Sequence, residues 1–139
     1  MTNPRENPQE LTAVDATPIE IEIKRATVEE CRKKVNEAEI LQEKADKKWW
    51  RANNLVEHAN IDVEFSHAQL CLSQRYGMDV EKNRKAYEEY LENSKGLVNL
   101  FEKADTELCE AKTELKNARA SLEAAELDLK KAQREAVKN

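Results

Sequence analysis

The sequence predicts an all-α protein, a long antiparallel two-helix coiled-coil hairpin. Two observations lead to this prediction: a heptad of large residues and alanines, and a single strong break in the helical pattern. In the last third of the chain, large apolar residues recur every seventh position, with alanine three positions behind each. These residues are Phe101, Leu108, Leu115, Leu122 and Leu129, with Ala104, Ala111, Ala118, Ala125 and Ala132. Such a repeat is typical of a coiled coil with large residues at a and alanine at d. We call this line of a and d positions the seam.

The composition suits long helices. Charged residues make up 37% of the 139 residues, aromatic residues 5%, and there are only 2 glycines and 3 prolines. This mixture is typical of coiled coils. The chain is acidic, with a net charge of −5, whereas a nucleic-acid-binding protein would carry a basic face. No apolar run is long enough for a membrane span.

The N-terminal segment is the least regular part. Residues 1–16 contain two of the prolines and few apolar side chains, so we expect a disordered tail there, before a hairpin over 17–139. Residues 17–27 allow two interpretations. Isoleucines alternate with charged residues as in a strand, whereas Thr17 and Pro18 are typical of a helix start. We expect an extended segment or a separate first turn, followed by a long helix that has begun by Val28.

Helix one is expected over about residues 28–76 and helix two over about 80–137. The seam of helix one reads Val28, Cys31, Val35, Ala38, Gln42, Ala45, Trp49, Ala52, Val56, Ala59 and Val63. The first part of the helix-two seam reads Val80, Asn83, Tyr87, Tyr90, Ser94 and Leu97. Residues 76–79 form the turn, because Gly77 suits the left-handed position after a helix and Asp79 can cap the next one.

The seam favours antiparallel pairing within one chain. In a parallel pair alanine would face alanine and leave voids, whereas an antiparallel pair sets a large residue against a small one. The register that pairs Ala45 with Leu108, and Val35 with Ala118, places the fold-back at Gly77. The register one heptad away fits the turn slightly less well.

The half near the turn carries more apolar residues than one seam needs. Ile61, Phe65, Ala68 and Leu72, which we call the apolar stripe, follow helical spacings on another face of helix one. Leu91 and Val98 flank the seam of helix two, and Trp50 lies off the seam of helix one. A second stripe usually packs against another helix. The candidates are a second copy forming a four-helix bundle, a different protein, or the N-terminal isoleucine segment folding back.

Candidate chemistry is sparse. The one metal-like pattern is Glu64, His67 and Cys71, and it occurs once in a chain with 2 histidines. We therefore expect no catalytic residues, no metal or other cofactor and no small-molecule substrate. The three cysteines are Cys31, Cys71 and Cys109. Their odd number and wide spacing do not suggest a disulfide framework. A chain without such a framework is expected in a reducing, cytoplasmic location.

These patterns predict a non-enzymatic protein–protein interaction or scaffold module that binds through the apolar surface near the turn. Its partner would be a second copy or a different protein. Two alternatives stay open: a helical bundle with a metal or redox site at Glu64, His67 and Cys71, and a rod-like spacer arm of a larger assembly.

Overall fold

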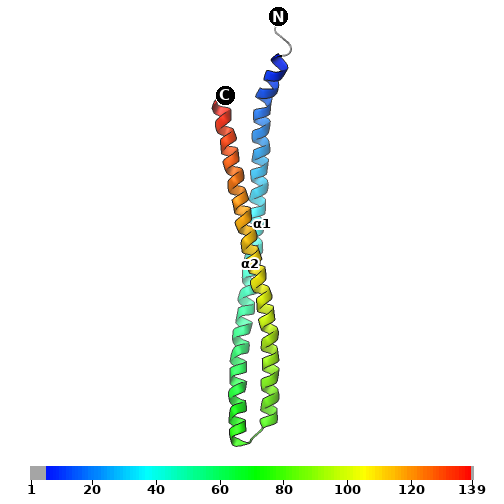
Figure 1. The fold of residues 1–139 in the computed structure, drawn as a ribbon, viewed down its shortest axis with the longest axis vertical. Coiled ribbons are helices and arrows are strands. Elements are labelled where there is room, and N and C mark those ends of the chain that lie inside the picture. Colours follow the sequence, from blue (N-terminus) through cyan, green and yellow to red (C-terminus); the bar gives the residue numbers. More distant parts are fainter. Residues whose placement is uncertain (1–5, 139) are drawn as a thin grey trace. The chain divides into compact units, whose positions relative to one another are not determined.

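Two helices pack as an antiparallel hairpin (Figure 1). This computed structural model describes the backbone of residues 6–138 and the side chains of residues 18–138. Helix α1 spans Glu6–Tyr76 and helix α2 spans Val80–Lys138. The described residues contain no strand. The predicted fold class, an all-α hairpin, is therefore confirmed.

Helix α1 begins earlier than the sequence predicted. The expected tail over residues 1–16 falls partly outside the described residues, and from Glu6 onward the backbone is helical. The extended segment or separate turn expected at residues 17–27 is wrong, because this stretch is continuous with α1. The physical reason is that the seam extends backward: Ile21 is half-buried one heptad before Val28, and Lys24 Nζ lies 3.0 Å from Asp128 Oδ2 of α2. Contacts with α2 thus favour the helix over the strand-like local pattern.

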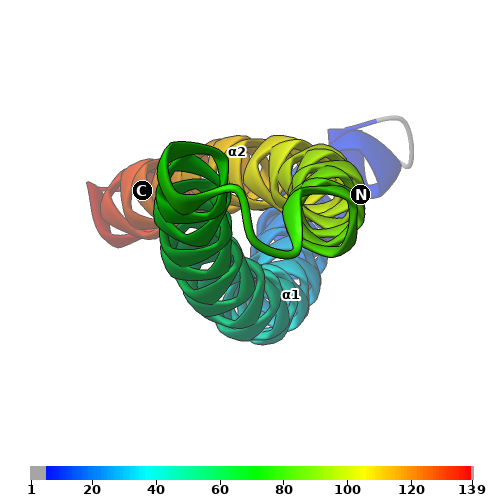
Figure 2. The ribbon, with the colours of Figure 1, turned by 90° about the horizontal axis from the view of Figure 1, so that it is seen from below.

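The turn is where the sequence predicted it, and Figure 2 shows the connection crossing from the end of α1 to the start of α2. Gly77 adopts φ 67°, the left-handed conformation that glycine reaches at least cost. The Met78 N–H donates a hydrogen bond of 3.0 Å to the Ser73 carbonyl. Together these features form a Schellman motif, which satisfies a carbonyl that the end of α1 would otherwise leave unpaired.

Asp79 directly precedes α2, and its backbone conformation was not predicted from the sequence. Its carbonyl accepts a hydrogen bond of 3.0 Å from the Asn83 N–H, the first bond of the new helix. Its φ is 54°, so the turn contains a second left-handed residue two positions after Gly77. Aspartate tolerates this conformation better than most residues because its short polar side chain can bond locally.

The chain divides into two compact units, each built from a segment of α1 and a segment of α2. The first unit comprises Met1–Ile40 with Thr113–Asn139. Its core is a cluster of Val35, Ala38 and Leu115, against which Ala118 and Leu122 pack. Here a large residue of one helix meets a small residue of the other, as the antiparallel seam requires.

The second unit comprises Leu41–Lys112 and includes the turn. Its core is a cluster of Ala45, Leu108 and Ala111, and Trp49 packs against it. The pairing of Ala45 with Leu108 agrees with the preferred register and not with the register one heptad away. The Lys48 ammonium lies 3.5 Å from the Glu107 carboxylate beside this cluster, which is consistent with the same register.

The seam of α1 continues to the turn, beyond Val63, where the seam predicted from the sequence ended. Ser66 and Ser73 are 4% and 6% exposed, and Leu70 between them is also buried. The Ser66 hydroxyl donates a hydrogen bond of 3.0 Å to the Val63 carbonyl, and the Ser73 hydroxyl donates one of 2.8 Å to the Leu70 carbonyl. Each buried hydroxyl is thus satisfied within its own helix, so the burial leaves no unpaired polar group there.

One assignment in the α2 seam needs correction. Tyr90 was expected in the seam and Leu91 beside it, but Tyr90 is 42% exposed and Leu91 is half-buried. A tyrosine side chain can keep its hydroxyl in water while its ring covers apolar surface. This favours a partly exposed position for Tyr90 at the edge of the interface.

Candidate interaction surface

The apolar stripe lies on a face of α1 that α2 does not cover. Ile61, Phe65 and Leu72 are 61%, 65% and 48% exposed, and Ala68 between them is also exposed. Ser66 and Leu70, from the same stretch of helix, are buried against α2. The two faces of α1 are therefore distinct, one packed within the hairpin and one open to solvent.

Further exposed apolar side chains lie close to the stripe in sequence. They are Leu55 before it, and Tyr76 and Met78 after it. The Arg75 guanidinium lies 5.8 Å from the centre of the Tyr76 ring, at the distance of a cation–π contact. From the sequence, Tyr76 and Met78 were expected only as part of the turn and Leu55 was not singled out, although all three are apolar.

The two tryptophans have different surroundings. Trp49 is half-buried in the seam, its ring centre lies 5.3 Å from that of Phe101, and its Nε1–H donates a hydrogen bond of 3.0 Å to Asp105. Trp49 is therefore a core residue, as predicted. Trp50 is exposed and meets the Trp49 ring edge-on, with centroids 5.1 Å apart. It lies about 16 Å along the helix from Ile61, so it is not continuous with the stripe.

The α2 residues that were grouped with the stripe form the edge of the hairpin interface. Leu91 is half-buried, and Val98 is only just exposed. Between them in sequence, the Ser94 hydroxyl lies 3.5 Å from the Asn60 side-chain oxygen of α1. Leu91 and Val98 thus flank the seam, as their spacing predicted, and do not extend the stripe.

The candidate metal ligands come together only in part. The Cys71 sulfur lies 3.9 Å and 4.0 Å from the two ring nitrogens of His67, and the His67 ring lies 5.3 Å from that of Tyr87. Within residues 18–138, no three His, Cys, Asp or Glu side chains gather where they could hold a metal ion. Glu64 therefore does not join His67 and Cys71, and two side chains fall short of the ligand sets that zinc uses.

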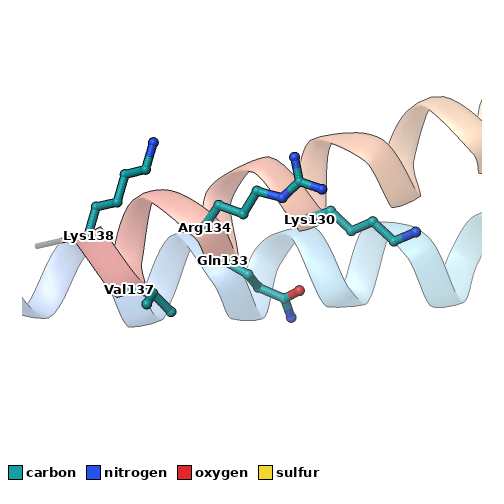
Figure 3. A pocket seen from close by; sticks show the side chains of 5 residues that line it. All are labelled: Lys130, Gln133, Arg134, Val137 and Lys138. Carbon is teal, nitrogen blue, oxygen red and sulfur yellow. The ribbon is translucent and has the colours of Figure 1, made fainter.

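A shallow depression of about 430 Å³ lies along the last turns of α2 (Figure 3). Its lining residues are Lys130, Gln133, Arg134, Val137 and Lys138. The three basic residues follow one another at four-residue spacing, and all three are exposed. Figure 3 shows all five side chains projecting from α2. An open surface lined by long, solvated side chains lacks the enclosure that small-molecule sites have.

Comparison with known proteins gives no match to a protein family or to a curated protein. Function therefore has to be inferred from the residues of this chain. In the part of the chain that the structure describes, neither helix has a stretch apolar enough to cross a bilayer.

Proposed function

We propose that this hairpin is a non-enzymatic protein–protein interaction or scaffold module that binds through the apolar stripe. The observation that carries the proposal is the exposure of Ile61, Phe65 and Leu72 on one face of α1. Clustered exposed apolar side chains are costly in water, and on soluble surfaces they commonly mark interaction sites. The large aromatic side chain at the centre, Phe65, is the type of residue that anchors an interface.

Position-specific photo-crosslinking tests this proposal. A photoreactive phenylalanine analogue replaces Phe65 in one variant and Ile40 in a matched control. Ile40 is 53% exposed on α1, but its neighbours one turn away, Asn36 and Lys44, are polar. We expect the analogue at position 65 to give discrete protein adducts in the native cell extract, and the analogue at position 40 to give none.

Adducts that are equally weak at both positions would contradict the proposal and favour the spacer-arm alternative. In that case the hairpin would act through its length, and its lateral surface would have no specific partner. A second variant, Leu72→Ser with the analogue at 65, should reduce the adduct yield because it removes a neighbouring apolar contact.

A further inference from the structure

We infer that the partner of the apolar stripe is a second copy of this chain, bound antiparallel, α1 against α1. This inference rests on the proposed function and names the partner of the same surface. The stripe residues are spaced by four, three and four positions, which is the spacing of a second coiled-coil seam. Because α2 packs on the face that contains Ser66 and Leu70, the stripe is open to another helix.

The stripe is complementary to itself in size. When two copies run antiparallel about a two-fold axis at residues 66–67, Phe65 of each copy faces Ala68 of the other. Ile61 of each copy faces Leu72 of the other. The largest side chain thus meets the smallest, as in the Ala45 and Leu108 layer of the hairpin. Two-fold symmetry forms every contact twice.

The flanking residues favour the antiparallel arrangement. In it, Asp62 lies opposite Gln69, Glu64 lies opposite Cys71, and no two like charges face each other across the stripe. Further along the same edge, two exposed apolar residues, Leu55 and Tyr76, lie opposite one another.

A parallel pair of the same stripes is less favourable for two reasons. It would place Phe65 against Phe65 and Ala68 against Ala68, which leaves one layer overfilled and the next underfilled. It would also bring Glu57 of each copy next to Asp62 of the other, and like charges across an interface raise its free energy.

The interface is small. Four residues per copy with their neighbours bury less than the ~1,200 Å² at which standard specific interfaces begin. We therefore expect a weak, reversible dimer. Sedimentation velocity of the purified chain should show a monomer at low protein concentration and a dimer at high protein concentration.

Disulfide trapping tests the register. Glu64 and Cys71 lie about 10 Å apart along one helix, too far for a bridge within the chain. In the variant Glu64→Cys, the inferred dimer places the new thiol opposite Cys71 of the other copy. Mild oxidation should therefore yield a covalent dimer, and peptide mass spectrometry should locate the bridge between positions 64 and 71.

Matched variants separate the outcomes. Glu57→Cys carries the new thiol one heptad earlier on the same face and should give no bridge to Cys71. Phe65→Ser should raise the dissociation constant at least about tenfold, because it removes the central anchor, whereas Ile40→Ser should leave it unchanged. Circular dichroism should show that all variants stay helical, since all four substituted positions are exposed.

Three results would overturn the inference. One is a wild-type chain that stays monomeric up to about 200 μM. Another is self-association that survives Phe65→Ser. The third is a Glu64→Cys chain that dimerises but forms no bridge between positions 64 and 71, which would exclude the inferred antiparallel register. A monomeric chain that still gives position-65 adducts with another protein would refute the dimer and leave the proposed function standing. A chain that neither dimerises nor gives position-65 adducts would refute the inferred dimer and the proposed function together.

Discussion

Two parts of the unit that contains the turn follow the same heptad but distribute their apolar residues differently. In the layer of Ala45, Leu108 and Trp49, apolar side chains fill the seam. Nearer the turn, buried Ser66 and Ser73 occupy the small seam positions where alanine stands elsewhere, Leu70 keeps a large one, and further large apolar side chains lie exposed on the opposite face of α1. A heptad therefore fixes which positions are buried, whereas the residues at those positions decide how much stability the burial supplies. The part near the turn therefore has less apolar surface in its seam and more on the exposed stripe.

The largest effect should come from the apolar layer. Leu108→Ala removes a side chain that is buried in the core cluster and leaves a cavity, so the free energy of unfolding should fall by about 2–4 kcal/mol. Urea unfolding followed by circular dichroism measures this. The matched change near the turn, Ser73→Ala, should alter the free energy by less than about 0.5 kcal/mol, because the serine bonds only within its own helix. Similar losses for the two variants would contradict the comparison.

The next largest loss of stability should come from overfilling the seam at the buried position of Ser66. Ser66→Leu places a bulky side chain where a small one is buried beside α2, and the free energy of unfolding should fall by about 1–3 kcal/mol. Thermal unfolding of the purified variant gives the value. A gain in stability would show that this part of the seam is loosely packed and that its weakness lies in unfilled volume.

The turn should show a smaller effect. Gly77→Ala forces a side chain into the left-handed conformation at φ 67°, while nothing lies within 4 Å of the added Cβ. The loss is therefore one of backbone conformation alone, about 1–2 kcal/mol. Urea unfolding should show this loss without a change in the slope against denaturant, since the same surface is exposed on unfolding. A loss far above this range would indicate a steric contact in the turn.

The last prediction is a small gain in the free energy of unfolding. Gly96 lies in the interior of α2, and an added Cβ there meets nothing within 4 Å. Gly96→Ala should raise the free energy of unfolding by about 0.5–1 kcal/mol, because alanine loses less backbone entropy in a helix. It serves as the control for Gly77→Ala, since the same substitution should have the opposite sign at the two glycines. A loss of stability at Gly96 would contradict the open space around this position.

The sequence predicted the seam through Val63, its register and the turn, because large and small residues alternate there with few exceptions. It did not predict the start of α1, because the alternating Ile19, Ile21 and Ile23 locally favour a strand. Contact with α2 stabilises the helix instead. Ser66 and Ser73 were missed because serine gives no apolar signal, although their spacing continues the heptad. For the candidate surface, the stripe was predicted residue by residue, while Leu91 and Val98 were grouped with it because spacing alone does not show which flank of the seam a residue covers.

The short connection at Gly77 has a consequence for the order of folding. Closing a loop of a few residues costs little entropy, so the layers nearest the turn can pair first. These are the serine layers, which supply little stability when they form. We therefore expect the transition state to extend past the contact of Trp49 with Phe101 to the layer of Ala45 and Leu108, because apolar contacts compensate there for the ordered chain. In stopped-flow experiments, Leu108→Ala should then slow refolding, whereas Ser73→Ala should leave the refolding rate almost unchanged.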